Sequence, residues 1–330
     1  MNTSRRYGKD WKAQTLSTTG EKCKVTVGVT CYNNGDNIGH LIADLQRQVF
    51  KTGGGATEII VVASGCTDNT VSEVRERSAR DKRIRLIVEQ HRNGKPSAIN
   101  KILQAMAGEI LVLVSGDIRL SDEYFIENIL SHFSSGADVV SCRPLPVNGT
   151  DTTEGYIGRL IWNLHDRTLM AQITNGLQRQ AGEAFAIRRE VAEEIPPNVI
   201  NDDAYLVLKA QLAGAKFVYA REITVRNRTP DRIQDILLQR ARIIRGHRQL
   251  RDAIGTSPSA LDVLIFKRPL IVTDVLIQEI KEQITERRLR ILCFLQLIAL
   301  ELAAHLLSGM WNFSHLWPTA ESAKWDREAV

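Results

Sequence analysis

Asp117, which follows a short apolar run, is a residue whose type and position suit a role in chemistry. The run 110–114 is typical of a strand buried on both faces of a parallel sheet, and Ser115-Gly116 allows a turn directly before Asp117. In open α/β sheets the carboxyl ends of the strands face the ligand. A carboxylate there can hold Mg²⁺ or Mn²⁺ against a diphosphate, whereas capping of the next helix is the alternative role of Asp117.

A pair of aspartates farther along the chain could supply a base. Asp202 and Asp203 follow the break at Pro196-Pro197 and precede a predicted helix at 204–213. A carboxylate within hydrogen-bond reach of a hydroxyl can take its proton while the hydroxyl attacks another molecule. Paired aspartates before a helix also serve as caps, so their place in the fold must decide between the two roles.

The elements that must position these residues alternate along the first part of the chain. Apolar runs predict strands at 23–30, 57–63, 84–88, 110–114 and 138–142, and periodic apolar residues predict helices at 38–49, 68–80 and 96–107. This alternation predicts an α/β fold with βαβ crossovers and a mostly parallel central sheet flanked by helices. The P-loop and dinucleotide-binding glycine motifs are absent, which argues against kinases, GTPases and NAD enzymes.

The regular alternation stops after residue 142. Helices are expected at 156–172, 204–213 and 234–250, short strands at 184–187 and 216–219, and an amphipathic helix at 261–283 that is interrupted at Pro269. We therefore predict three parts: a polar tail at 1–22, a main domain at 23–255, and a C-terminal region of amphipathic and apolar helices at 256–330.

The composition limits the classes of protein to which this chain can belong. It has 330 residues, 43% of them hydrophobic and 25% charged, so a sizeable core can form. The net charge of +5 suits an anionic ligand or membrane surface but does not indicate nucleic-acid binding. Five scattered cysteines without a CxxC pair favour a reducing, cytoplasmic compartment, and the polar N-terminus does not read as a secretory signal peptide.

The apolar stretch 291–310 is long enough to cross a membrane. Twenty helical residues reach roughly 30 Å, the thickness of the hydrocarbon layer. Glu301 would be costly at that depth without a partner, while the basic flank 286–290 suits the cytoplasmic side. With Trp311 and Trp317 following the stretch, we expect this region to associate with the inner face of the cell membrane, spanning it or lying in its interface. A buried helix of a soluble core is the alternative.

Five short motifs occur in a specific order. They are VVASGCTDNT at 61–70, NGKPSAIN at 93–100, SGD at 115–117, INDDAYL at 200–206 and QRARI at 239–243. Together they resemble the family 2 glycosyltransferases of the GT-A fold over about residues 24–250. The resemblance implies an inverting transferase that uses a nucleotide-sugar donor, with Mn²⁺ or Mg²⁺ as cofactor.

The resemblance assigns several residues to the nucleotide-sugar donor. The positions that match the family's donor contacts are Thr30, Tyr32, Asn33, Ser64, Asp68, Lys95, Asn100 and Ser115. The family's second motif carries two acidic residues where this chain has Ala63-Ser64. The identity of the nucleotide is therefore open, with UDP as the first expectation, and Asp68 also suits a helix N-cap.

The resemblance also implies roles for the acidic residues. Asp117 matches the metal ligand of the family's DxD motif, in which Ser115 replaces the usual first aspartate and removes a charge. Asp203 matches the catalytic base, and Asp202 would orient a neighbour or contact the acceptor. Inversion requires a base because the acceptor hydroxyl must lose its proton while it attacks opposite the departing diphosphate. The metal and nearby arginines would neutralise the leaving group.

The last motif resembles the QxxRW motif of enzymes that build polysaccharides. Gln239 and Arg242 match, but Ile243 replaces the tryptophan, which favours the transfer of one sugar over polymer synthesis. Arg242 and Arg240 can pair with diphosphate oxygens, unless they belong to a solvated basic helix face. Glu183 falls where the family builds the floor of its acceptor site.

These observations predict a transferase that moves a sugar to a hydroxyl of a lipid-linked or saccharide acceptor near a membrane. Two alternatives stay open. A nucleotidyltransferase that makes nucleotide sugars also uses an α/β sheet and a metal, although the turn after the first strand lacks its basic residue. A non-catalytic, membrane-proximal protein that binds nucleotide sugars would tolerate Ala63, Ser64, Ser115 and Ile243.

Overall fold

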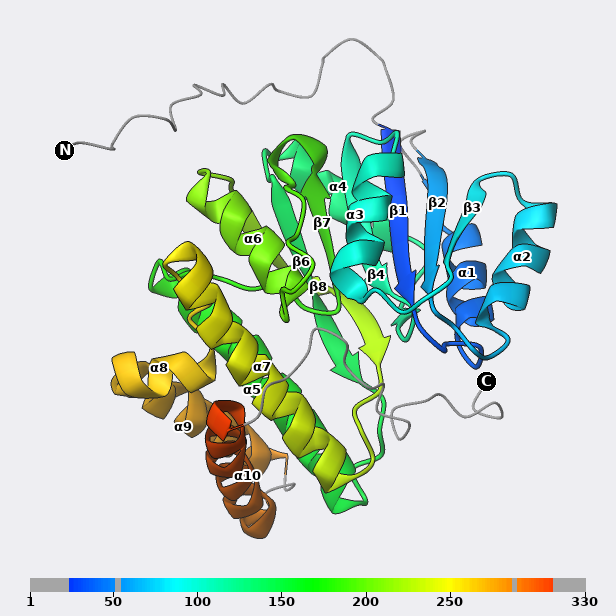
Figure 1. The fold of residues 1–330 in the computed structure, drawn as a ribbon. Helices are drawn as coiled ribbons and strands as arrows, with labels where there is room; N and C mark the ends of the chain where they lie inside the picture. The colour runs from blue at the N-terminus through cyan, green and yellow to red at the C-terminus, as the bar shows by residue number, and fades with distance from the viewer. Residues whose placement is uncertain (1–23, 51–54, 287–289, 311–330) are drawn as a thin grey trace.

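The computed structural model describes residues 24–50, 55–286 and 290–310. The predicted polar tail at 1–22, the middle of the predicted basic flank and the two tryptophans after residue 310 lie outside these ranges. Within them, a sheet with its helices is followed by a layer of helices from the second half of the chain (Figure 1).

Eight strands of the described ranges form one sheet in the order β3-β2-β1-β4-β7-β6-β8-β5. They are β1 (Lys24–Cys31), β2 (Gly55–Ser64), β3 (Ile84–Glu89), β4 (Ile110–Ser115), β5 (Arg119–Leu120), β6 (Val139–Pro146), β7 (Ala184–Arg188) and β8 (Phe217–Asn227). β3, β2, β1 and β4 pair in parallel, as do β6 and β8, whereas β7 and β5 pair antiparallel with their neighbours. The prediction of an α/β fold with a mostly parallel sheet is confirmed.

Helices cover the sheet and extend beyond it. They are α1 (Ile38–Gln46), α2 (Thr70–Arg80), α3 (Lys95–Ala105), α4 (Phe125–Ser134), α5 (Thr153–Thr174), α6 (Asp202–Leu212), α7 (Ile233–Ile254), α8 (Leu261–Lys267), α9 (Pro269–Thr285) and α10 (Ile291–Met310). The long helices α5 and α7 lead away from the sheet in Figure 1, with α9 packed on α5 and α10 packed on α7.

Side chains of the central strands alternate between two cores. On β4, Ile110, Val112 and Val114 face the core that α1, α2 and α4 cover, whereas Leu111 and Leu113 face the core that α3 and α6 cover. All five side chains are buried. Because a strand between two helical layers is apolar on both faces, the run 110–114 shows no polar alternation.

The helix α4 and the strand β5 were not predicted from the sequence, and β6 and β8 are both longer than expected. α4 buries Phe125, Ile129 and Phe133, a helical spacing that the sequence contains. The short β5 pairs with β8, which continues past the predicted end at 219 because its second half pairs with β6. The expected break at Pro269 is present, since α8 ends at Lys267 and α9 begins at the proline.

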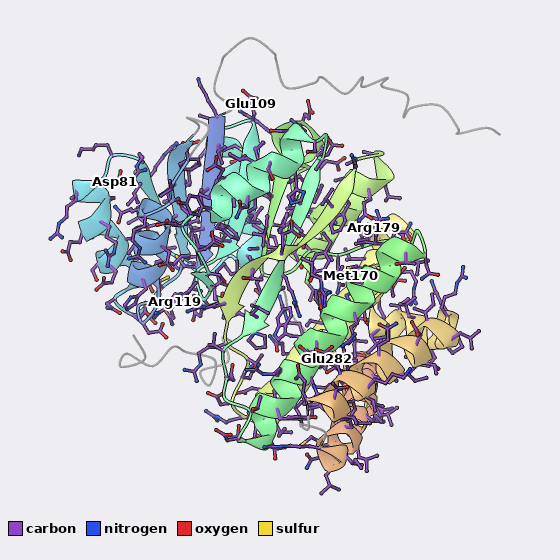
Figure 2. The ribbon with its side chains drawn as sticks, turned by 180° about the vertical axis from the view of Figure 1, so that it is seen from behind. Asp81, Glu109, Arg119, Met170, Arg179 and Glu282 are labelled. Atoms are coloured by element: carbon purple, nitrogen blue, oxygen red, sulfur yellow. The ribbon has the colours of Figure 1, made fainter. Side chains whose placement is uncertain are left out.

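The C-terminal helices attach to the rest of the protein through charged and apolar contacts. Arg240 of α7 donates hydrogen bonds of 2.6 and 3.2 Å to the carboxylate of Glu301 on α10, so this glutamate has a partner within the protein. In the part of the chain that the structure describes, α10 is the one helix long and apolar enough to cross a membrane, and 28% of its apolar window is buried. Figure 2 shows this layer from behind, where Met170 of α5 and Glu282 of α9 lie far from Asp81 beyond α2.

Candidate active site

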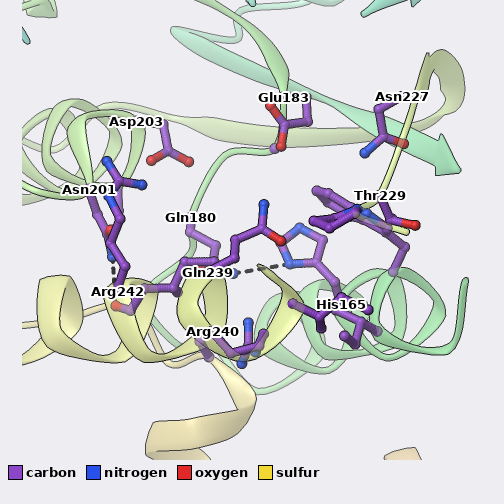
Figure 3. A pocket seen from close by; sticks show the side chains of 18 of the residues that line it. His165, Gln180, Glu183, Asn201, Asp203, Asn227, Thr229, Gln239, Arg240 and Arg242 are labelled. Atoms are coloured by element: carbon purple, nitrogen blue, oxygen red, sulfur yellow. Dashed lines mark hydrogen bonds between the residues drawn. The ribbon is translucent and has the colours of Figure 1, made fainter. Parts of the chain in front are cut away.

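A cavity of about 540 Å³ opens at the carboxyl ends of β1 and β4 and continues between α5, α7, α8 and α10. The predicted site residues that line it are Thr30, Tyr32, Asn33, Ser64, Lys95, Ser115, Asp117, Glu183, Asp202, Asp203, Gln239, Arg240 and Arg242. Asp203 and Glu183 lie on one side of this cavity in Figure 3, opposite Gln239 of α7. The fold therefore brings Asp117 and Asp203 to one cavity although they are far apart in sequence.

Asp117 is positioned by the turn that follows β4. The buried amide of Asn37 donates hydrogen bonds to the carbonyl oxygens of Gly116 (2.9 Å) and Ile118 (2.8 Å). A Cβ on Gly116 would lie 2.7 Å from Cβ of Cys31, so glycine is required where this turn meets the end of β1. These contacts fix the backbone on both sides of Asp117, whose own side chain is exposed.

Lys95 lies between the strand-end turn and the aspartate pair. Its Nζ donates a hydrogen bond to Oγ of Ser115 (3.1 Å) and lies 3.6 Å from Oδ2 of Asp202, a buried residue in the first turn of α6. Burial alone would lower the pKa of Lys95, but Asp202, Glu183 and Asp203 outweigh burial and raise it. The lysine is therefore charged at neutral pH and is shared by several carboxylates.

The carboxylates around Lys95 crowd one another. Burial and Asp117 raise the pKa of Glu183 to about 7, and burial and Asp202 raise the pKa of Asp203 to about 6. The side chain of Asp117 is exposed to the cavity, whose walls restrict the water around the carboxylate and so raise its pKa. The charge of Lys95 opposes each of these shifts without cancelling it, so these carboxylates bind protons at a higher pH than isolated ones do.

The turns after β1 and β2 form the part of the cavity where the donor nucleotide is expected. Asn33 has a left-handed backbone (φ 52°), a conformation that asparagine adopts more readily than most residues, and its Oδ1 accepts a hydrogen bond from the backbone of Thr67 (2.8 Å). The guanidinium carbon of Arg92 lies 3.8 Å from the centre of the Tyr32 ring, a cation–π contact. Ser64 accepts a hydrogen bond from the backbone of Asn93 (3.2 Å).

Two residues that were expected to contact the donor do not line the cavity. Asp68 accepts hydrogen bonds from Thr70 (2.5 and 3.0 Å) and from the backbone of Gly35 (2.9 Å), so it joins the two turns near the start of α2. The amide of Asn100 exchanges two hydrogen bonds of 2.8 Å with the backbone of Ile195. In this structure both side chains hydrogen-bond within the protein, and their contacts to the donor stay predictions.

The two arginines of the last motif face different surroundings. Arg242 lines the cavity, donates a hydrogen bond to the carbonyl oxygen of Ile200 (2.9 Å), and is near the carboxylates of Asp202 and Asp203. Arg240 also lines the cavity, but its guanidinium donates two hydrogen bonds to the carboxylate of Glu301 on α10. The expectation that Arg240 binds a diphosphate stays a prediction, and in this structure its guanidinium is paired with Glu301.

The cavity also contains residues that the sequence analysis missed. Arg92 directly precedes the NGK motif, which was the available signal for its place at the donor end. His165 and Gln180 lie 3.1 Å apart, ring Nδ1 to Nε2, beside Gln239 (Figure 3), and burial lowers the pKa of His165 to about 4. This histidine is neutral at pH 7. No motif or spacing in the sequence points to it.

Three comparisons place these features among known proteins. The model of the family "Glycosyl transferase family 2" matches residues 26–196, which is about half of the chain. A curated relative, glycosyltransferase AglE of Haloferax volcanii, is 20% identical over 203 residues, and the match covers 60% of this chain but only 65% of that protein, less than two thirds of its length.

Solved structures show the same fold at low identity. The mannosyltransferase PcManGT from Pyrobaculum calidifontis, in complex with GDP-Man and Mn²⁺, matches with a TM-score of 0.62 and 19% identity over 88% of both chains. Glucosyl-3-phosphoglycerate synthase from Mycobacterium tuberculosis, in complex with Mn²⁺, UDP and phosphoglyceric acid, matches with a TM-score of 0.51 and 16% identity over 72% of this chain and 80% of that chain. The fold is thus GT-A, and the chain belongs to glycosyl transferase family 2.

Proposed function

We propose that this protein transfers a sugar from a nucleotide sugar to a hydroxyl of a lipid-linked or saccharide acceptor, with inversion at the anomeric carbon. The observation that supports this most is the shared cavity. Asp117 lies at its sheet edge, Asp203 lies at the start of α6, and Lys95 interacts with the charges of both. A donor whose diphosphate lies near Asp117 would present its sugar toward Asp203.

In this proposal Asp203 is the general base. Its carboxylate accepts the proton of the acceptor hydroxyl while the hydroxyl oxygen bonds to the anomeric carbon and the bond from that carbon to the diphosphate breaks. A pKa of about 6 suits this role, because the group is largely deprotonated at pH 7 yet basic enough to hold the proton. Asp202, which is buried beside Lys95, orients this part of α6.

The leaving diphosphate requires positive charge, which Lys95 and Arg242 supply from the walls of the cavity. Among the described residues no group of three or more His, Cys, Asp or Glu side chains could hold a metal by itself. The site fits a divalent cation that is shared with the donor, because Asp117 offers a carboxylate ligand at the cavity that Glu183 and Asp203 also line. Mn²⁺ or Mg²⁺ bound there would neutralise the diphosphate.

Solved structures of the same fold and the residues of the cavity limit which donor and which kind of transfer to consider first. UDP and GDP sugars are the first donors to consider, since solved structures of the same fold hold UDP-glucose or GDP-Man with Mn²⁺. We favour UDP from the motif resemblance. Ile243 lines the cavity where the related polysaccharide motif has tryptophan, which favours the transfer of a single sugar over a role in polysaccharide biosynthesis.

We also propose that the C-terminal helices place the protein at the inner face of the cell membrane. α10 packs along α7 by one side, while Leu292, Leu295, Leu302 and Leu306 are between 57% and 75% exposed on the other. An exposed apolar surface of this kind marks a membrane or protein contact. Because Glu301 is paired with Arg240 on α7, the arrangement favours a helix that lies in the interface over one that spans the bilayer.

A panel of nucleotide sugars, measured by thermal shift with and without Mn²⁺, tests the donor and the metal together. We expect one donor to raise the Tm only when Mn²⁺ is present, and Asp117→Asn to reduce that Mn²⁺-dependent shift strongly. Release of pyrophosphate from a nucleoside triphosphate would instead favour a nucleotidyltransferase. Donor binding without transfer or hydrolysis on a broad acceptor panel would favour a non-catalytic binding protein.

A further inference from the structure

The catalytic cavity does not end at the acidic residues. Beyond Gln239 and His165 its walls become mostly apolar, and they come from α5, α7, α9 and α10. The residues that define this apolar part are Ile161, Leu164, Ile236, Leu276, Ile298 and Leu302. The cavity therefore joins a polar end, where the sugar transfer is proposed, to a hydrocarbon-lined end among the C-terminal helices.

The apolar end opens at the surface between α8 and α10. Ile265 and Phe266 of α8 line the cavity and are 50% and 76% exposed, and Ile298 and Leu302 of α10 line it and are 55% and 63% exposed. A side chain that borders an internal cavity and is at least half exposed lies at its mouth. The mouth thus lies within the exposed apolar surface of α10 that we assign to the membrane.

Charged residues within these walls are paired with each other. Arg240 and Glu301 form one pair, and the ring Nδ1 of His247 lies 2.9 Å from the carboxylate of Asp262 in a second, buried pair. A hydrocarbon chain passing these residues would not have to displace water from an unpaired charge.

We infer that this apolar end binds the hydrocarbon chain of a lipid acceptor, which enters between α8 and α10 and presents its polar head to Asp203. The inference rests on the proposed function, because it names the acceptor class for the same site. A purely water-soluble saccharide would leave the apolar walls and the mouth without a role. An amphiphile fills both ends of the cavity, and its chain continues into the membrane on which α10 lies.

Butyl glucoside and dodecyl glucoside, used below their micelle concentrations, test this inference on the full chain by titration calorimetry. Each buried methylene contributes about fourfold in affinity, so burial of even a few methylenes makes dodecyl glucoside bind more than about tenfold tighter. The double variant Ile298→Gln/Leu302→Gln should abolish most of this preference. The matched variant Leu295→Gln/Leu306→Gln changes side chains of similar exposure on the same helix that do not line the cavity, and should keep it.

Equal binding of the two glucosides by the unmodified chain would overturn the inference, as would equal losses in the two double variants, because both results indicate adsorption to the outer surface. The donor thermal shift is measured on the same samples. Donor binding without a chain-length preference defeats this inference alone. A chain-length preference without binding of any donor in the panel defeats the proposed function and leaves the lipid site standing.

Discussion

The carboxylates of the cavity near the sheet and those of the helical layer have pKa values that are shifted in opposite directions. At the sheet edge, burial and neighbouring acids raise the pKa of Asp203 to about 6 and of Glu183 to about 7. In the helical layer, His247 lowers the pKa of Asp262 to about 2 against the effect of burial. Asp166 of α5, whose pKa is also lowered, accepts hydrogen bonds from Tyr219 and Arg221.

This difference separates residues that hold the fold from residues that are kept for a ligand. A buried acid with a dedicated partner strengthens the contact between two elements, as Asp262 does between α8 and α7. Acids that crowd one another destabilise the folded protein, and such crowding is typical of sites that act on a ligand. The two arginines of the last motif differ in a similar way: Arg240 is paired with Glu301, whereas Arg242 lies beside Asp202 and Asp203.

The largest effect is expected for Asp203→Asn. Asparagine keeps the shape of the side chain but cannot accept a proton, so transfer should fall by about 10²- to 10⁴-fold. Donor affinity should stay nearly unchanged, because the proposed role concerns the acceptor proton. Asp252→Asn, which alters a 73% exposed side chain on α7, is the matched control. Transfer by Asp203→Asn at the unmodified rate would remove this residue from its role.

Arg242 and Arg240 provide a second test on a single helix. Arg242→Gln should lower the rate of transfer by about 100-fold through loss of charge beside the leaving diphosphate, with little change in the free energy of unfolding. Arg240→Gln should instead lower the free energy of unfolding by about 2 kcal/mol, since Glu301 would keep a partly buried, unpaired charge. Urea unfolding and steady-state kinetics of both variants decide the assignment. If Arg240→Gln instead lowered the rate and Arg242→Gln lowered the free energy of unfolding, Arg240 would be the arginine that binds the diphosphate.

The pH dependence of kcat/KM for the unmodified protein is the smallest of the expected effects. It distinguishes Asp203 from Glu183 as the general base. A base acts when it is deprotonated, so kcat/KM should be at its plateau above the pKa of the base and fall as the pH drops through that value. With Asp203 as the base, about half of the plateau should remain near pH 6. A midpoint near pH 7 would point to Glu183 instead.

Much of the site could be predicted because strand ends and helix starts are local features. Asp117 follows an apolar run that is buried on both faces, and Asp203 lies in the first turn of α6, so their meeting at one cavity follows from the topology of an α/β sheet. The hydrogen-bond partners of Asn100 and Arg240 could not be predicted from the sequence. They depend on the backbone of Ile195 and on the position of α10, which no pattern near either residue reveals.

The structure of the protein with its preferred nucleotide sugar and Mn²⁺ bound tests the central claim most directly. The account predicts that the metal and the diphosphate lie against Asp117 and that the anomeric carbon faces Asp203 across a gap wide enough for an acceptor hydroxyl. A donor that binds in this cavity with its sugar directed away from Asp203, or that binds elsewhere on the molecule, would contradict it.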